Sequence, residues 1–264
     1  MNALAVKSML AEFPRKTAPI PKAGERWALF LDVDGTLVEF QPLPEMVHIP
    51  DTLLRNVCEL HHVLDGALAF VSGRTLEQLD HLFAPMKLPS AGQYGMERRD
   101  GNGALHGVIL PDASVAEVVR EHAYELLSRF PGLKVEDKGY SIALHYRAAP
   151  HLVGAITTAA EAIVAPLHGM YEVQPGALVQ EIKPSTCSKG AAVRAFLAEA
   201  PFDGRIPVFL GDDFADESAF AAVNTLGGIS IAVGTDRYTQ ADYALSGPAA
   251  ARRWLSLVLN ALSS

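Results

Sequence analysis

The sequence predicts an α/β protein whose mostly parallel sheet is interrupted by a smaller α+β insertion. Short apolar segments typical of buried strands alternate with amphipathic helical segments at both ends of the chain. In the middle, strand-like segments come in pairs around turn residues, which is typical of a small antiparallel layer. We expect a leader at residues 1–25, an α/β core at residues 26–103 and 184–264, and the insertion at residues 104–183.

The first half of the core reads as strand, helix, strand, helix. Residues 27–31 and 67–71 are continuous apolar runs, as expected of strands buried on both faces. The segment after Pro50 carries apolar residues at helical spacing and stops at Gly66, and a second helix is expected from about Thr75. Strands joined through helices make crossover connections, so this part of the sheet is expected to be parallel.

The remaining elements follow from the same periodicities. We expect a turn at residues 100–103, just before the insertion, and in the insertion helices at 112–130 and 151–166 and strands at 133–136, 140–147, 170–173 and 178–183. In the second half of the core we expect helices at 189–199, from about 216 and at 249–262, and strands at 206–210, 229–233 and 243–245. The leader, which contains three prolines, is expected to be loosely held.

Charge and cysteine content narrow the class of protein. The 264 residues carry a net charge of −8, which argues against a nucleic-acid binder. Cys58 and Cys187 form no zinc or redox motif. The N-terminus lacks the apolar region of a signal peptide, and no apolar run approaches the ~20 residues that span a bilayer. We therefore expect a cytoplasmic monomer that binds neither nucleic acid nor membrane.

Two carboxylates, Asp32 and Asp34, directly follow the first buried strand. Ligands of open α/β sheets bind outside the carboxyl ends of the strands. Two carboxylates so close repel each other, which favours a divalent cation with oxygen ligands. An Asp-Gly hairpin turn is the plainer alternative. A calcium loop is excluded because Leu37 and Leu43 stand where it needs Gly and Glu.

Ser72, Arg74 and Lys189 stand near predicted helix N-termini. A hydroxyl beside free helix amides is suited to hold a phosphate, although Ser72 also fits a plain N-cap. A lysine in a first helical turn is unfavourable with the helix dipole. Lys189 therefore suggests an anionic ligand or nearby aspartates, with a solvated side chain as the alternative.

A second acidic cluster follows the strand expected at 206–210. Four acids stand within six residues at the carboxyl end of that strand, and their crowding favours a cation. Helix capping by Asp213 and first-turn acids accounts for one or two of them. We therefore expect this acidic cluster to serve a metal.

Taken in order, the four motifs D-x-D-G-T, S-G-R, K-G and G-D-D-x-x-D resemble those of the haloacid-dehalogenase-like superfamily. The resemblance implies a Rossmann-like core, Mg²⁺ and phosphoryl transfer through an aspartate, and the position of the insertion matches the C2 type of cap. It implies that Asp32 is the nucleophile, that Asp34 is the acid–base residue, and that both bind the metal with Asp212, Asp34 through its backbone carbonyl. Ser72 and Lys189 would hold the phosphoryl oxygens, supported by Arg74, Asp213 and Asp216.

Segments 91–99, 144–147 and 179–184 extend the resemblance to the trehalose-6-phosphate phosphatase family, over about residues 27–260. Three positions depart from the family, which commonly has His, Lys and Thr at Tyr94, Ala177 and Ala215. The first two of these positions touch possible sugar contacts.

Strand alternation suggests how the insertion meets a ligand. His145 and Arg147 share one face of their strand with Ala143, and Glu181 and Lys183 share one face of theirs. Such polar faces suit a ligand rich in hydroxyls, although a solvated sheet face is the alternative. We expect the substrate to be bound by Glu97, His145, Arg147, Glu181 and Lys183.

The predicted activity is hydrolysis of a small sugar phosphate, trehalose 6-phosphate above all, through an aspartyl phosphate. A phosphatase for sucrose 6-phosphate or a mannosyl phosphate is the nearest alternative, and a mutase is a third. A binding module without catalysis is disfavoured, because binding needs no nucleophile such as Asp32.

Overall fold

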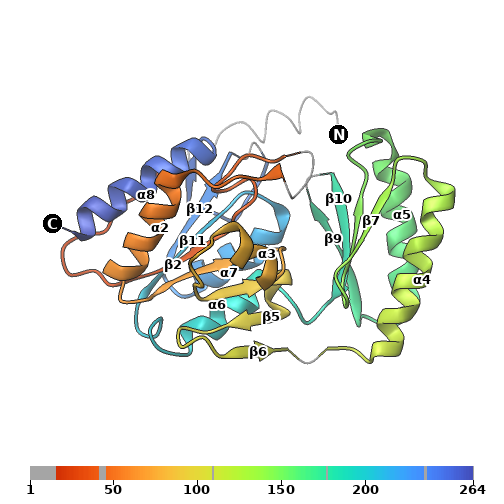
Figure 1. Ribbon diagram of the computed structural model, residues 1–264, viewed down its shortest axis with the longest axis horizontal. Helices are drawn as coiled ribbons and strands as arrows, with labels where there is room; N and C mark the ends of the chain where they lie inside the picture. Colours follow the sequence, from red (N-terminus) through yellow and green to blue (C-terminus); the bar gives the residue numbers. More distant parts are fainter. Residues whose placement is uncertain (1–15, 42–45, 109, 177, 235–236, 264) are drawn as a thin grey trace.

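The computed structural model describes residues 16–41, 46–108, 110–176, 178–234 and 237–263 of the chain. These residues form a larger α/β layer and a smaller α+β layer, which lie side by side (Figure 1).

The larger layer is built on a sheet of nine described strands in the order β1-β13-β12-β11-β2-β3-β4-β5-β6. Pairing is parallel from β1 to β4 and antiparallel between β4, β5 and β6. The strands are β1 (Lys16–Thr17), β2 (Trp27–Leu31), β3 (Leu68–Val71), β4 (Ser90–Gly92), β5 (Glu97–Arg99), β6 (Leu105–Gly107), β11 (Ile206–Gly211), β12 (Ile229–Val233) and β13 (Tyr243–Leu245).

Helices cover this sheet, with α2 beside α8 and α6 beside α7 (Figure 1). Buried aromatic rings of Phe30, Phe196 and Phe202 stack between the sheet and α6. The helices are α2 (Asp51–Val63), α3 (Leu76–Leu82), α6 (Lys189–Leu197), α7 (Glu217–Thr225) and α8 (Pro248–Leu262), with short 3₁₀ turns η2 (Gln93–Gly95) and η5 (Phe214–Asp216).

The smaller layer has its own sheet, in the order β7-β8-β10-β9, and every pairing in it is antiparallel. Helices α4 and α5 lie on its outer side, away from the larger layer (Figure 1). Alternate strand residues such as Ile142, Leu144 and Ile182 pack against these helices, so the opposite strand face looks toward the larger layer. The elements are α4 (Ala113–Arg129), β7 (Lys134–Asp137), β8 (Ile142–His145), η3 (Pro150–Leu152), α5 (Val153–Val164), η4 (Ala165–Leu167), β9 (Tyr171–Gly176) and β10 (Val179–Pro184).

The structure confirms the predicted fold class, and it differs from the expected boundaries in three places. β6 pairs with β5 in the larger sheet, so the chain stays in that sheet beyond residue 103, where we expected the insertion to begin. β4 was not anticipated, because three small residues give no strand signal. Of the expected leader, residues 1–15 lie outside the described residues, and Lys16–Thr17 pairs with β13.

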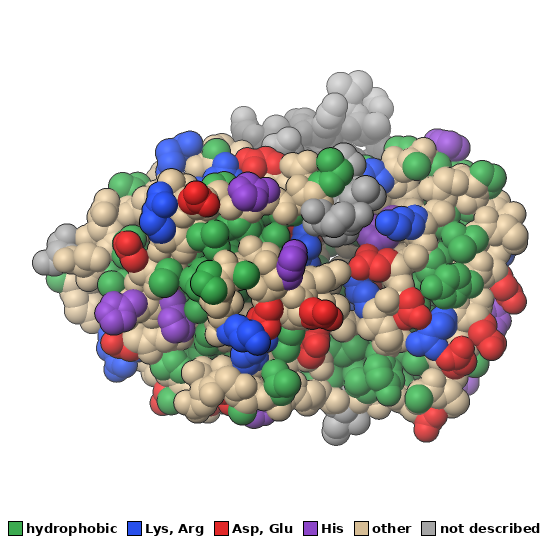
Figure 2. All heavy atoms as spheres, viewed as in Figure 1, with side chains coloured by type: hydrophobic (Ala, Val, Ile, Leu, Met, Phe, Trp, Pro, Cys, Tyr) green, Lys and Arg blue, Asp and Glu red, His purple; other side chains and the backbone are tan. Residues whose placement is uncertain are grey.

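One described helical stretch, Pro150–Leu167, is long and apolar enough to cross a membrane by length and composition alone. No such stretch was expected from the sequence. Its residues Ile156, Ala160 and Ile163 are buried in the hydrophobic cluster of the smaller layer. On the face drawn in Figure 2, acidic and basic side chains are interspersed and do not form a single basic patch.

Candidate functional site

Three neighbouring strands of the larger sheet end at one cavity. Asp32 follows β2, Ser72 follows β3 and Asp212 follows β11, and β2 lies between the other two strands. Parallel strands bring their carboxyl ends to the same edge, which is why motifs far apart in sequence meet here. The cavity has a volume of about 450 Å³ and is closed on the other side by residues of the smaller sheet.

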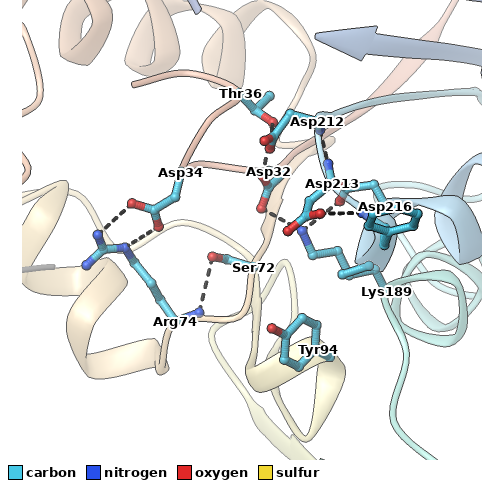
Figure 3. A network of polar contacts seen from close by, with 12 residues as sticks. Asp32, Asp34, Thr36, Ser72, Arg74, Tyr94, Lys189, Asp212, Asp213 and Asp216 are labelled. Carbon is cyan, nitrogen blue, oxygen red and sulfur yellow. Dashed lines mark hydrogen bonds and ion pairs between the residues drawn. The ribbon is translucent and has the colours of Figure 1, made fainter. Parts of the chain in front are cut away.

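Lys189 is the central cation of the site. Its Nζ lies 2.6 Å from Asp32 Oδ1 and 2.6 Å from Asp216 Oδ1, and the side chains of all three residues are buried (Figure 3). Burial alone would lower the pKa of Lys189, but Asp216 and Asp32 outweigh it and leave the pKa above its ordinary value. The lysine is therefore charged, which explains a cation in the first turn of α6.

Asp216 orients the acidic loop rather than facing the cavity. Its Oδ2 accepts hydrogen bonds of 2.9 Å from the backbone amides of Asp212 and Asp213, and its Oδ1 accepts from Lys189. Both carboxylate oxygens are therefore used within the protein. Asp213 lines the cavity, and its Oδ1 accepts from the amide of Phe214 at the start of η5.

Asp32 and Asp212 are crowded carboxylates. The hydroxyl of Thr36 lies 3.0 Å from an oxygen of each, so it bridges the two residues. Burial raises the pKa of Asp32 to about 7 although Lys189 opposes the shift. Burial, followed by the charge of Asp32, raises the pKa of Asp212 to about 9. Each carboxyl thus resists ionisation beside the other, unless a cation is bound between them.

The donor set suits a hard divalent cation. One carboxylate oxygen each of Asp32, Asp212 and Asp216 lie within 4.8 Å of one another, and carboxylate oxygens are the ligands that Mg²⁺ prefers. Gly35 keeps this corner open, because a Cβ there would lie 2.2 Å from Asp212 Oδ2, and its φ of +81° also favours glycine.

Asp34 lies on the other side of Asp32 from Lys189 (Figure 3). Arg74 holds it by two hydrogen bonds, Nε to Oδ2 at 2.6 Å and Nη2 to Oδ1 at 2.7 Å. The amide of Arg74 in turn donates to Ser72 Oγ at 3.2 Å. The S-G-R loop and the D-x-D loop are thus tied together beside the cavity, as their strand ends predict.

The smaller layer closes the cavity with a buried carboxylate, Glu181 of β10. Lys138 Nζ lies 3.1 Å from Glu181 Oε1 and 3.2 Å from Oε2, and Ser141 Oγ donates to Oε1 at 3.0 Å. From the larger layer, the hydroxyl of Tyr94 donates to Oε2 at 3.0 Å. Lys138 Nζ also donates to the carbonyl oxygen of Gly73 at 3.2 Å, so this cluster joins the two layers.

His145 and Arg147 also line the cavity, as predicted. His145 Nε2 lies 2.8 Å from Glu136 Oε2, and this hydrogen bond lowers the pKa of Glu136 to about 2, although burial opposes the shift. Arg147 donates to the carbonyl oxygen of Gln41 in the larger layer. Glu136 and Lys138 were missed from the sequence, although Lys134, Glu136 and Lys138 alternate as charged residues on one face.

Two predicted substrate residues do not line the cavity. Glu97 accepts a hydrogen bond of 2.7 Å from the amide of Leu76 at the start of α3. Lys183 is buried; its Nζ lies 2.5 Å from Glu172 Oε1 and 2.5 Å from the carbonyl oxygen of Cys187. Of the three family departures, Tyr94 and Ala215 line the cavity, and Ala177 lies outside the described residues.

The fold and the strand-end motifs define a member of the haloacid-dehalogenase-like superfamily with an inserted cap, and the two layers are from here on called the core and the cap. A family model described as trehalose-phosphatase matches residues 30–249. A trehalose-6-phosphate phosphatase of Escherichia coli (strain K12) is 45% identical over 242 residues, which are 92% of this chain and 90% of that protein. The chain therefore belongs to the trehalose-phosphatase family.

One further relative and one solved structure are also similar to this chain. A probable trehalose-phosphate phosphatase of Sinorhizobium fredii is 39% identical over 210 residues, 80% of this chain and 78% of that protein. Among solved structures, the C-terminal domain of a Candida albicans trehalose-6-phosphate phosphatase has a TM-score of 0.80 at 20% identity, with 93% of this chain and 99% of that chain covered. At that identity the structural match supports the fold alone.

Proposed function

We propose that this chain hydrolyses trehalose 6-phosphate to trehalose and inorganic phosphate through an aspartyl phosphate. One observation carries the proposal: a single cavity is lined by Asp32 and Lys189 of the core and by Glu181 of the cap. We call the core side of the cavity, with Asp32 and Lys189, the core wall, and the side around Glu181 the cap wall. A single ligand can therefore place its phosphate on the core wall and its hydroxyls on the cap wall. The activity of the relatives that cover most of the chain supports this substrate. Nothing favours sucrose 6-phosphate or a mannosyl phosphate over it.

In this proposal the phosphoryl group is bound and attacked on the core wall. An oxygen of Asp32 attacks phosphorus while the bond to the sugar oxygen breaks. Lys189, held between Asp32 and Asp216, opposes the negative charge that builds on the phosphoryl oxygens. Ser72, at the end of β3, donates a further hydrogen bond to them. Asp213 and Asp216 keep the acidic loop in place.

Mg²⁺ would be held by carboxylate oxygens of Asp32 and Asp212 and by the backbone carbonyl of Asp34. Bound there, it would neutralise charge on the phosphoryl group and on the crowded carboxylates. The raised pKa values of Asp32 and Asp212 support this assignment, because burial and the nearby carboxylates raise both although Lys189 opposes the shift.

Asp34 is proposed to protonate the leaving sugar oxygen and then to take a proton from the water that hydrolyses the aspartyl phosphate. Arg74 engages both of its carboxylate oxygens. At least one of these hydrogen bonds has to open before Asp34 reaches the leaving group. Arg74 therefore holds both carboxylate oxygens of Asp34 until one of these hydrogen bonds opens.

The cap wall is proposed to recognise the sugar. Glu181, Glu136, Lys138 and His145 offer acceptors and donors in a partly closed site, as a ligand rich in hydroxyls requires. A site built from paired polar groups rejects ligands that leave those groups unpaired. Arg147, at the rim, joins the cap to Gln41 of the core. Glu97 and Lys183 are proposed to position neighbouring elements rather than to touch the sugar.

Phosphate release tests the proposal. The chain is incubated with Mg²⁺ and, separately, with trehalose 6-phosphate, sucrose 6-phosphate, mannose 6-phosphate and p-nitrophenyl phosphate. We expect kcat/KM to be highest for trehalose 6-phosphate and the activity to vanish with EDTA. Equal kcat/KM for all three sugar phosphates would contradict the substrate assignment, and full activity in EDTA would contradict the metal site.

A further inference from the structure

We infer that Tyr94 is a positioning residue that couples recognition of the sugar by the cap to the phosphate-binding loop of the core. The inference rests on the proposed function and deepens it. Tyr94 is not one of the residues that the sequence motifs assign to catalysis, yet its side chain connects the core to Glu181 of the cap, as Lys138 and Ser141 connect the cap to the core.

Tyr94 contacts both walls. Its backbone amide donates to the carbonyl oxygen of Ser72 at 3.0 Å, and the preceding amide, of Gln93, donates to the carbonyl oxygen of Arg74 at 2.8 Å. At its other end the phenolic hydroxyl donates to Glu181 Oε2 at 3.0 Å. One residue thus spans the distance from the loop proposed to hold the phosphate to the carboxylate proposed to bind the sugar.

The backbone of Gln93 and Tyr94 adopts an unfavourable conformation. Gln93 and Tyr94 have φ values of 47° and 59°, in the left-handed region that residues with a side chain rarely adopt. Such a conformation persists only where surrounding contacts impose it, and these conformations gather at functional sites. Here the imposing contacts are the two amide hydrogen bonds to the S-G-R loop, which fix where the phenol ring points.

The ring itself is enclosed. A Cβ on Gly73 would lie 2.8 Å from the Tyr94 hydroxyl oxygen, so the phenol packs on the loop backbone at a position that only glycine allows. Lys138 completes the arrangement, since its ammonium reaches both Gly73 O and Glu181. Any separation of the cap from the core would break the hydrogen bond between Glu181 and Tyr94 and the one between Lys138 and Gly73.

The role follows from the chemistry of Glu181. A buried carboxylate is useful to a sugar only if its oxygens point at the hydroxyls, and its direction here is set by three donors. Ser141 and Lys138 belong to the cap, although each also donates a hydrogen bond to the core, whereas Tyr94 belongs to the core itself. Tyr94 therefore fixes the carboxylate relative to the phosphate site, which is the distance that a sugar phosphate has to match.

The test is Tyr94→Phe, which removes one oxygen and keeps the ring. A hydrogen bond to a charged group that orients it is worth on the order of tenfold or more in binding. We therefore expect KM for trehalose 6-phosphate to rise by about tenfold, with kcat changed by less than about threefold because the chemistry lies on the core wall. Hydrolysis of p-nitrophenyl phosphate, which has no sugar to place, is expected to stay within about twofold of the wild type.

Tyr171→Phe is the matched control. Tyr171 is a buried tyrosine of the cap, and no described group forms a hydrogen bond with its hydroxyl. Loss of that oxygen is expected to leave both substrates unchanged. An unchanged KM for trehalose 6-phosphate in Tyr94→Phe would overturn the inference, and so would a loss of equal size on both substrates, which would assign Tyr94 to the core alone. Failure of the wild-type chain to hydrolyse trehalose 6-phosphate would instead overturn the proposed function.

Discussion

The two walls of the cavity hold their charged groups in different ways. On the core wall, Lys189 lies between Asp32 and Asp216, and all three come from the core. On the cap wall, Glu181 takes its partners from both parts of the molecule, Lys138 and Ser141 from the cap and Tyr94 from the core. The ion pairs of Lys189 on the core wall therefore involve no residue of the cap. Glu181 on the cap wall, in contrast, has all three of its donors only when the cap contacts the core.

This difference suggests that the core wall acts on phosphorus and that the cap wall selects the leaving group. Groups that must act on phosphorus need a fixed geometry, and neighbouring parallel strand ends provide it. Groups that must choose between leaving groups can depend on cap position, because they act only when the correct sugar is present. Substitutions of the core-wall groups that act on phosphorus should therefore impair every phosphate monoester alike, and substitutions on the cap wall should impair only the sugar phosphate.

The largest effect is expected for the nucleophile. Asp32→Asn replaces the attacking oxygen by an amide and should reduce kcat for trehalose 6-phosphate and for p-nitrophenyl phosphate by at least ~10⁴-fold, as loss of a nucleophile does elsewhere. The substitution is nearly isosteric and removes a crowded charge, so the thermal unfolding temperature should not fall. A folded variant with a near-normal rate on either substrate would remove Asp32 from this role.

A smaller and substrate-dependent loss is expected at Asp34. Asp34→Asn keeps the backbone carbonyl but cannot transfer a proton, which should lower kcat for trehalose 6-phosphate by at least ~10²-fold. The loss should shrink for p-nitrophenyl phosphate, because nitrophenolate leaves without being protonated. Steady-state rates on both substrates measure the difference. Equal losses would mean that Asp34 serves another purpose, such as holding Arg74.

The crowded carboxylates predict a pH dependence of stability in the metal-free protein. In the folded chain, burial first and the neighbouring carboxylates second raise the pKa of Asp32 to about 7 and that of Asp212 to about 9, compared with 3.8 for an ordinary aspartate. Between those limits the folded state binds more protons than the unfolded state, so stability should fall as pH rises from about 4 to about 9. In EDTA the unfolding temperature should drop by several degrees over this range.

Addition of Mg²⁺ and the substitution Asp212→Asn test this pH dependence of stability further. Mg²⁺ should restore the unfolding temperature most at the alkaline end, where both carboxyls are ionised. Asp212→Asn should flatten the curve between about pH 7 and pH 9, because its titration has been removed. An unfolding temperature in EDTA that is constant across this range would show that the two carboxyls are not crowded in the folded chain.

Much of the core wall was predictable from the sequence because three of its four motifs directly follow a continuous apolar run. Asp32 and Asp212 needed only strand assignments and the rule that parallel strands end together. The roles of Arg74 and Thr36 as connectors were not predictable, since their partners lie 40 and 176 residues away. Nor was the end of the core sheet at β6, whose short exposed segment carries no buried-strand pattern.

The cap wall was predicted less well, for a different physical reason. Alternation correctly put Glu181 and Lys183 on one strand face, but it does not say where along that face the cavity ends. Glu172 and Tyr94 cover Lys183, and Glu97 is used at a helix start. Lys138 was overlooked although it stands two and four residues after Glu136 and Lys134, an alternation that was readable in the sequence.

The division between the two walls is tested most directly by Glu181→Gln, compared with Glu161→Gln on the exposed side of α5. The measurement is the ratio of kcat/KM for trehalose 6-phosphate to kcat/KM for p-nitrophenyl phosphate. Our account predicts that this ratio falls by at least about tenfold in Glu181→Gln, because an amide cannot replace a buried carboxylate among three donors, and that it is unchanged in Glu161→Gln. A ratio equal to that of the wild type in Glu181→Gln would contradict the account, whether both activities survived or both were lost together.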